Sequence, residues 1–291
     1  MNMDKKKIVY GILIVLFIIV FMALAMLYGA FYSAPSQFLV RYETLDSVFI
    51  PQQMDDVTIL FFSDLDYGTF MDEKRLSKLT DKINEVAPDA IIFGGDLFDE
   101  AYGTIRQNDR DIVVQHLSSL QAPLGKFAVL GDNDYRTGEY ASDVMSILFD
   151  SNFEVLVNAS VLLRNKGSGS VTLTGIDSAL NGNPEIDIAY ANVGRAVYNI
   201  AICHTPDIAD EIPGDLTNYM ISGHSHGGQA YWGFNALYTP PWAEKYFRGK
   251  TTIGNFTLDI TNGVGTTIRD VRFLANAEVV LYRLKHKAMM E

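Results

Sequence analysis

Carboxylate and imidazole side chains recur in this sequence directly after short apolar runs of the kind that form buried strands. The acidic residues are Asp64 and Asp66 in SDLD, Asp96 and Asp99 in GGDLFD, and Asp132 and Asp134 in GDND. The imidazoles are His204 in ICHTPD, and His224 and His226 in GHSHGGQ. Carboxylate oxygens and imidazole nitrogens together form the ligand set of Mn, Fe or Zn. The chemistry that these residues could perform is therefore that of a metal site.

Each motif taken singly is weak evidence, because an Asp after a strand more often caps a helix or closes a turn. Their shared position is more informative. In open α/β sheets, ligands bind in the crevice at the carboxyl ends of the strands. Side chains two residues apart, such as Asp64 and Asp66 or His224 and His226, can reach the same site. Five segments that end in this way predict one metal cluster.

The segments between the motifs alternate between strand and helix patterns. Almost wholly apolar runs predict buried strands at residues 57–62, 90–93 and 126–130. Asp72 can cap a helix whose apolar positions recur at helical spacing until Pro88 stops it. Further helices are expected at residues 109–120 and 142–149. Such alternation implies right-handed crossovers and a largely parallel sheet.

The second half of the chain is typical of short strands joined by loops. They are expected at residues 161–163, 171–174, 198–203, 219–222, 257–260, 270–273 and 278–283, after a first strand or pair at 38–41 and 47–50. Residues 166–170 (KGSGS) suit a hairpin turn. Two packed sheets flanked by helices account for this pattern better than one sheet does. One domain is therefore expected over residues 34–286, followed by a tail at 287–291.

The amino terminus has the composition of a membrane anchor. Lys5, Lys6 and Lys7 precede an apolar run over residues 8–32 that has no charged side chain. A run of ~20 apolar residues crosses the hydrocarbon core, and the apolar part of a cleavable signal is shorter. We expect residues 1–33 to form a short cytoplasmic tail and a single transmembrane helix, with the domain outside the cell membrane. Cleavage after Ala25 is the main alternative, and the unbroken apolar run disfavours a buried core helix.

Composition narrows the classes of function. The chain has 291 residues, with 35 Asp and Glu against 23 Lys and Arg, and a formal net charge of −12. Binding to nucleic acid is not expected, because phosphate recognition needs basic surface. The acidic balance serves solubility, or it reflects carboxylates that hold metal. The single cysteine, Cys203, excludes an intrachain disulfide and suits a buried strand position.

Taken in order, the motifs resemble those of the calcineurin-like metallophosphoesterases, over roughly residues 42–285. The blocks of that family are Asp-x-His, Gly-Asp-x-x-Asp, Gly-Asn-His-Asp/Glu, a single His and Gly-His-x-His. GGDLFD and GHSHGGQ are the most specific matches. Together with the anchor, they resemble a bacterial membrane-associated branch that includes enzymes similar to UDP-2,3-diacylglucosamine pyrophosphatase. The resemblance implies an α/β fold, a four-layer α/β/β/α sandwich of two mixed sheets flanked by helices.

The resemblance also implies a site for two divalent or mixed-valence metal ions. One ion would be held by Asp64, Asp66, Asp96 and His226, and the other by Asp96, Asp132, His204 and His224. Asp99 would orient a ligand or its loop. Such ions lie ~3.5–4 Å apart, where they activate water and clamp phosphoryl oxygens.

Three positions depart from the family pattern. Asp66 stands where the family has a His ligand, Asp132 replaces an Asn ligand, and Asn133 replaces a His near the leaving group. Four carboxylates would lower the charge of the cluster from about +2 to about zero, which favours Mn, Fe or Mg over Zn. Asn133 can donate a hydrogen bond but cannot transfer a proton, so hydrolysis of esters with poor leaving groups would suffer most.

These residues predict a metal-dependent hydrolase of a phosphodiester or pyrophosphate, either a small molecule or a lipid-linked substrate, at the outer face of the membrane. The alternative is a binding protein of the same fold that the three substitutions have weakened as a catalyst. Aromatic residues at 231–232, 238 and 242–247 either form an interfacial or substrate-covering loop or pack as ordinary loop residues.

Overall fold

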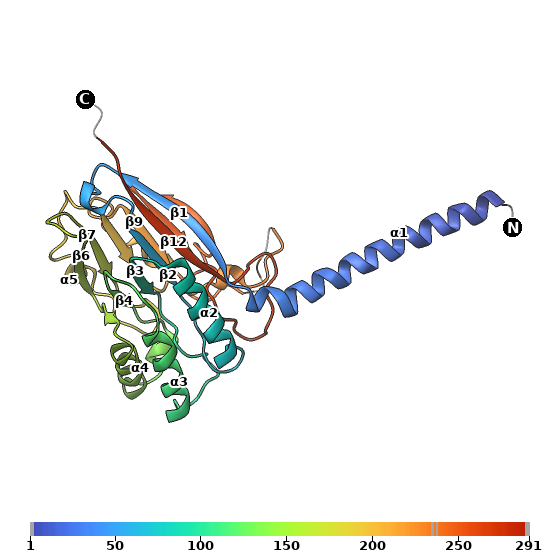
Figure 1. Cartoon of the computed structure of the whole chain (residues 1–291), viewed down its shortest axis with the longest axis horizontal. Coiled ribbons are helices and arrows are strands. Elements are labelled where there is room, and N and C mark those ends of the chain that lie inside the picture. Colours follow the sequence, from blue (N-terminus) through green and yellow to red (C-terminus); the bar gives the residue numbers. More distant parts are fainter. Residues whose placement is uncertain (1–2, 234–235, 237, 289–291) are drawn as a thin grey trace.

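A long amino-terminal helix projects from an α/β domain in the computed structural model, which describes residues 3–233, 236 and 238–288 (Figure 1). The helix α1 (Met3–Tyr28) continues as a π-helical turn, η1 (Gly29–Ser33), and a 3-10 turn, η2 (Ala34–Ser36). The span Lys6–Ser36 reaches a mean hydropathy of 3.1, and none of its most apolar stretch is buried against the domain. This helix is long and apolar enough to cross a membrane.

The first sheet carries the strands that precede the acidic motifs. Its order is β1-β12-β2-β3-β4-β5. The strands are β1 (Leu39–Ser47), β12 (Glu278–His286), β2 (Thr58–Phe62), β3 (Ala90–Phe93), β4 (Lys126–Ala128) and β5 (Glu154–Val155). Strands β2 to β5 are parallel, and β12 pairs antiparallel with β2 and parallel with β1. The helices α2 (Glu73–Val86), α3 (Gln107–Ser118) and α4 (Gly138–Asp150) pack on one face of this sheet (Figure 1).

The second sheet carries the strands that precede the histidines, in the order β10-β11-β9-β8-β7-β6. The strands are β10 (Gly249–Ile253), β11 (Phe256–Ile260), β9 (Tyr219–Ser222), β8 (Asn199–Ile202), β7 (Ser170–Gly175) and β6 (Ala159–Arg164). The four inner strands are parallel, and the two edge strands pair antiparallel. Within the described part of the chain, its outer face carries short helices, α5 (Ile186–Ala189) and the 3-10 turn η5 (Pro206–Asp210). The expected sandwich of two mixed sheets flanked by helices is confirmed, with a thin fourth layer.

The core explains why the parallel strands are apolar throughout. Phe62 and Phe93 face the helices, whereas Phe61 and Ile92 face the second sheet. A strand buried on both faces has no polar alternation. A third apolar layer covers the outer face of the second sheet and includes the buried Cys203, as its apolar surroundings in the sequence predicted.

Some local expectations were wrong or incomplete. Strand β1 is continuous to Ser47, and residues 48–50 form a turn instead of a second strand. Residues 270–273 make only an isolated bridge, from Phe273 to Ala230. The backbone there wraps around the buried guanidinium of Arg272, which donates hydrogen bonds to the carbonyl oxygens of Gly263, Gly265 and Ala275. Strand β10 was not expected, because its exposed edge position requires few apolar residues.

A buried ion pair joins the two sheets. Asp259, on β11 of the second sheet, is fully buried. Its two carboxylate oxygens accept hydrogen bonds from the guanidinium of Arg41 on β1, at 3.0 Å each. The hydroxyls of Tyr282 and Tyr219 donate to the same carboxylate at 2.8 and 3.1 Å. Four donors from both sheets therefore converge on one side chain.

We expect Asp259→Ala to lower the free energy of unfolding by about 3–5 kcal/mol, because it removes the buried acceptor that Arg41, Tyr219 and Tyr282 share. Thermal unfolding of the full-length chain in detergent measures the change. The double variant Arg41→Met/Asp259→Leu removes both charges and should lose less stability than the single variant. A double variant that is as unstable as Asp259→Ala would contradict a contribution from the charge of Arg41 to this loss.

Lys126, at the start of β4, gives stability a dependence on pH. Its ammonium donates to the carbonyl oxygen of Leu117 at 2.9 Å, and burial lowers its pKa to about 8 from 10.5. The unfolded chain therefore binds the proton more tightly, so the contribution of Lys126 to stability rises with pH between about 8 and 10.5. We expect Lys126→Met to raise the melting temperature at pH 7. The gain should shrink above pH 8 and vanish near pH 10.5; a constant gain would contradict this account.

Candidate metal centre

The seven residues that the sequence predicted as metal ligands all follow strands, at the carboxyl ends of both sheets. In the first sheet, β2 precedes Asp64 and Asp66, β3 precedes Asp96, and β4 precedes Asp132. In the second sheet, β8 precedes His204, and β9 precedes His224 and His226. All seven side chains are largely or fully buried. The two sheets therefore contribute different chemistry to one place, with carboxylates from the first and imidazoles from the second.

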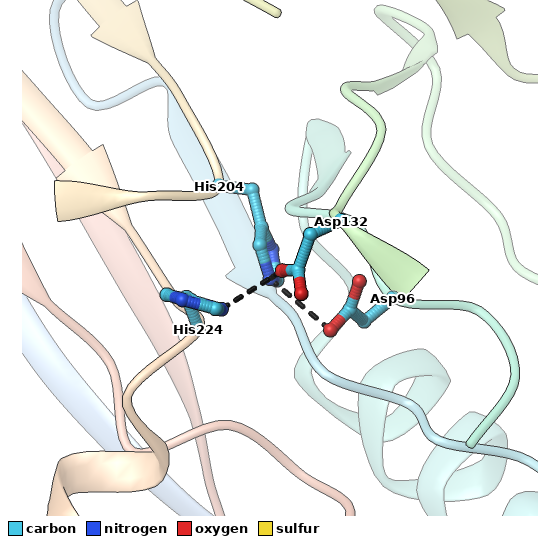
Figure 2. Close-up of side chains that lie close together, drawn as sticks. All are labelled: Asp96, Asp132, His204 and His224. Atoms are coloured by element: carbon cyan, nitrogen blue, oxygen red, sulfur yellow. Dashed lines mark ion pairs between the residues drawn. The ribbon is translucent and has the colours of Figure 1, made fainter. Parts of the chain in front are cut away.

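Four of these residues form a compact group in which the potential ligand atoms all lie within 4.8 Å of one another. Figure 2 shows the side chains of Asp96, Asp132, His204 and His224 pointing toward a common centre. Nε2 of His204 lies 3.2 Å from Oδ2 of Asp96 and 3.3 Å from Oδ1 of Asp132. Nδ1 of His224 lies 2.9 Å from the same Oδ1 of Asp132. This group is the set that the sequence assigned to one of the two ions.

The remaining candidates lie beside this group. Nε2 of His226 is 3.6 Å from Oδ2 of Asp66 and 3.7 Å from Oδ1 of Asp64. The same oxygen of Asp64 is 3.9 Å from Nε2 of His204, which belongs to the first group. The structure thus brings Asp64, Asp66 and His226 together and places them next to the group of Asp96, Asp132, His204 and His224.

Backbone carbonyls fix which nitrogen two of the imidazoles present. Nδ1 of His204 lies 2.7 Å from the carbonyl oxygen of Gly94, and Nε2 of His224 lies 2.8 Å from that of Pro241. A carbonyl oxygen only accepts, so each of these nitrogens must be the donor. The opposite nitrogen of each ring faces the carboxylates. Second partners of this kind orient the imidazoles of metal sites and fix their tautomer.

The pKa shifts of the clustered carboxylates indicate that a bound cation would stabilise their charged forms. Burial, together with the charges of Asp96 and Asp64, raises the pKa of Asp66 well above its usual range. Burial and the charge of Asp132 raise the pKa of Asp96. The pKa of Asp132 is held below its usual range, since the adjacent imidazoles of His204 and His224 outweigh its burial. Buried carboxylates at such spacing stay ionised together only when cations lie among them.

Several atoms of the cluster support the same conclusion, because they are buried polar atoms without a hydrogen bond of good geometry among the described residues. They include Oδ2 of Asp66, Oδ1 of Asp132 and Nε2 of His204. Buried polar atoms normally have partners, so orphaned ones need an explanation. An oxygen and nitrogen donor set of this kind fits divalent cations, and the residues present therefore fit a two-metal centre.

Five of the seven clustered residues have a strained backbone conformation. Asp64, Asp66, Asp96, His224 and His226 have φ angles of 56°, 48°, 60°, 68° and 51°. Residues other than glycine rarely adopt positive φ, and such strain gathers at functional sites where the surrounding structure enforces it. Glycine is required nearby, because a Cβ on Gly131 would lie 2.0 Å from Oδ1 of Asp96. The strained backbone lowers the stability of these loops but orients the side chains toward the cluster.

Two supporting residues were not given a role from sequence. The carboxylate of Asp134 accepts hydrogen bonds from the backbone N–H groups of Gly131, Leu97 and Asp96 at 2.8, 2.9 and 3.0 Å, and burial raises its pKa to about 7. The side chain of Gln229 bonds the N–H of Thr267 and the carbonyl oxygens of residues 267 and 269. Both lie in motifs already noted, GDND and GHSHGGQ, which was the available signal.

The two residues expected to act in catalysis lie close to the cluster. The backbone N–H and Nδ2 of Asn133 donate to the two oxygens of Asp96 at 2.9 and 3.0 Å. Asn133 therefore orients the carboxylate at the centre of the cluster in this structure. Oδ1 of Asp99 accepts from the N–H of Ala101 at 2.8 Å, and its charge is among those that raise the pKa of Asp66. Their roles in catalysis stay predictions.

A cavity of about 260 Å³ opens onto the cluster. It is lined by Asp96, Glu100, Asp132, Asn133, Leu180, Asn181, His224, His226, Tyr238, Pro240, Pro241 and Thr267. This set includes acidic, amide and aromatic side chains but no Lys or Arg. The described lining therefore offers an anionic ligand hydrogen-bond donors from amide and imidazole groups but no Lys or Arg side chain.

Comparisons with known proteins agree with this geometry. The profile of the calcineurin-like phosphoesterases matches residues 57–228. "Uncharacterized metallophosphoesterase YkuE" of Bacillus subtilis is 30% identical over 261 residues, which are 89% of this chain and 90% of that protein. "UDP-2,3-diacylglucosamine pyrophosphatase LpxG" of Chlamydia muridarum is 26% identical over 220 residues, which are 59% of this chain and 64% of that protein. This chain belongs to the calcineurin-like metallophosphoesterase family.

Proposed function

We propose that this chain hydrolyses a phosphodiester or a pyrophosphate through a two-metal site at the outer face of the membrane. One observation carries the proposal: the ligand atoms of Asp96, Asp132, His204 and His224 lie within 4.8 Å of one another beside an open cavity. Membership of the family supports metal-dependent phosphoester hydrolysis as the general activity.

The residues divide into two sets that share one carboxylate. Asp64, Asp66, Asp96 and His226 would hold one ion, and Asp96, Asp132, His204 and His224 would hold the other. When bound, the ions would supply Lewis-acid activation of water and neutralise charge on the phosphoryl oxygens. The four carboxylates favour Mn, Fe or Mg over Zn. The carbonyl oxygens of Gly94 and Pro241 keep two of the imidazoles in the required orientation.

Asn133 limits the class of ester. It lines the cavity and donates to Asp96, and its amide has no proton that it can transfer to a leaving group. A diphosphate, or a diester with a stable leaving anion, needs little protonation as it departs. We therefore assign such esters as substrates, and the hydrolysis of an unactivated alkyl diester would be slow.

The membrane orientation supports a lipid-linked substrate. Lys5 to Lys7 lie in the first turns of α1, ahead of its apolar run, and favour a cytoplasmic amino terminus, which would put the domain on the outer face. The related protein LpxG is named for hydrolysis of a diacylated pyrophosphate. A second candidate function, binding without turnover, is favoured by the substitutions at Asp66, Asp132 and Asn133.

We expect Asp96→Asn to reduce hydrolysis by more than ~100-fold, because even the outer partners of metal ligands typically account for 10–100-fold. Initial rates on bis(p-nitrophenyl) phosphate in Mn²⁺ measure the effect. Bound metal, counted by mass spectrometry after gel filtration, should fall in parallel. Asp150→Asn is the matched control, since Asp150 lies on the surface in an ion pair with Arg110 and should keep full activity.

Two outcomes of this experiment favour other accounts. A wild-type chain that binds metal yet hydrolyses no mono- or diester would favour the binding protein. Activity that survives in Asp96→Asn would contradict the two-metal assignment.

We expect Asn133→His to accelerate hydrolysis of a diester with a poor alkoxide leaving group, by up to the ~10²–10⁴-fold that general acids contribute. The rate on an aryl diester or a pyrophosphate should change little. Asn133→Ala separates this effect from loss of the hydrogen bond to Asp96, because it removes the amide without supplying an acid. Equal rates for wild type and Asn133→His on the alkyl ester would contradict the missing-acid explanation.

A further inference from the structure

Exposed or half-buried apolar side chains lie on the loops of the domain that meet the end of α1. We call Trp232, Ile268, Phe273 and Leu274 the collar. The exposed fractions of Trp232, Ile268 and Leu274 are 58%, 67% and 58%, and the ring of Trp232 packs on that of Phe273 with centroids 4.8 Å apart. Large apolar side chains gathered at one exposed place mark an interaction surface.

Trp232 and Phe273 of the collar, neighbouring loop residues, and the end of α1 with η1 line an apolar groove of about 820 Å³. Its lining residues are Ala23, Met26, Leu27, Ala30 and Phe31 on one side, and Ala230, Trp232, Arg269, Val271 and Phe273 on the other. This volume lies within the ~300–1,000 Å³ of typical ligand pockets. An apolar groove of this size suits a hydrocarbon chain.

One hydrogen bond joins the two sides of the groove, and others fix the loops on the side of the domain. The N–H of Arg272 donates to the carbonyl oxygen of Ala30 at 2.9 Å, which ties the collar loop to the end of the helix. The N–H of Tyr231 donates to the carbonyl oxygen of Phe273 at 2.8 Å. The buried guanidinium of Arg272 fixes the same loop from inside. The groove is therefore a defined feature of the junction.

The length of α1 indicates what covers this surface. A hydrocarbon core takes ~20 helical residues, and counting from Ile8, after the lysines, ends at Leu27. The groove is lined by Ala23, Met26 and Leu27, which thus fall within the outer leaflet. The collar packs at the same level, and Trp is enriched at the membrane interface. Lipid, and not water, would surround these side chains.

One loop connects the collar to the metal site. Thr267 lines the catalytic cavity, and the next residue, Ile268, belongs to the collar. Gln229, three residues after His226, bonds the backbone of this loop on both sides of Ile268. One short, fixed segment therefore contributes Thr267 to the cavity and Arg269 to the groove.

We propose that the collar inserts into the outer leaflet and that the groove binds an acyl chain of a membrane lipid, so that the cavity receives the phosphoester in the headgroup region of a lipid. This inference deepens the proposed function and rests on the proposed membrane anchoring. It identifies the substrate class as acylated phosphoesters at the bilayer surface.

The test measures lipid contact of one side chain in the full-length chain. The variant Trp242→Phe leaves Trp232 as the only tryptophan. In phosphatidylcholine nanodiscs its emission should be shifted to the blue, and lipid brominated on the acyl chains should remove most of it. The matched control carries Trp232→Phe, Trp242→Phe and Phe149→Trp. Phe149 is 76% exposed on α4, on the side of the domain away from α1 (Figure 1), so this tryptophan should keep its emission.

A second measurement addresses the groove itself. Phosphatidylcholine with a diazirine on its acyl chain should crosslink to residues 230–232 and 271–273 as well as to α1. Labelling of α1 alone, or Trp232 emission that is quenched no more than in the control, would overturn the inference. A chain that fails to enter nanodiscs would overturn both the anchoring and the collar. Strong quenching without hydrolysis would support the collar and count against the proposed function only.

Discussion

The confinement of four carboxylates to one buried place is the constraint on which the rest of this structure depends. Burial and the charges of neighbouring carboxylates oppose the ionisation of Asp66 and Asp96, and the buried carboxylates of Asp64 and Asp132 lie beside them. Such a cluster is stable only if cations or protons compensate it. The strained φ angles, the glycine at position 131 and the buried acceptor at Asp134 make sense as the means of holding these side chains against their repulsion.

The paired sheets explain how the chain satisfies that constraint. One sheet alone would gather carboxylates at its carboxyl edge, but the imidazoles come from β8 and β9 of the other sheet. Packing between the sheets, with the buried pair of Arg41 and Asp259, fixes the distance between the two ligand types. The loop that follows β9 is hydrogen-bonded to the segment that meets the end of α1, so the metal site and α1 belong to one framework.

The sequence predicted the sheets, the main helices and the seven clustered residues, because buried parallel strands are apolar throughout and their ends carry the ligands. It missed β10, whose exposed edge needs no apolar pattern, and it placed a strand at residues 270–273. There the fully buried Arg272, which a sequence pattern treats as a surface residue, organises the backbone. The roles of Asp134 and Gln229 depend on contacts with distant loops, which local patterns do not encode.

The central claim is that this cluster holds two cations that share Asp96. A crystal structure of the domain soaked with Mn²⁺, with data collected at the manganese absorption edge, tests it most directly. The account predicts two anomalous peaks ~3.5–4 Å apart, one among Asp96, Asp132, His204 and His224 and the other beside Asp64, Asp66 and His226. No peak within reach of Asp96, or a single ion bound elsewhere on the surface, would contradict it.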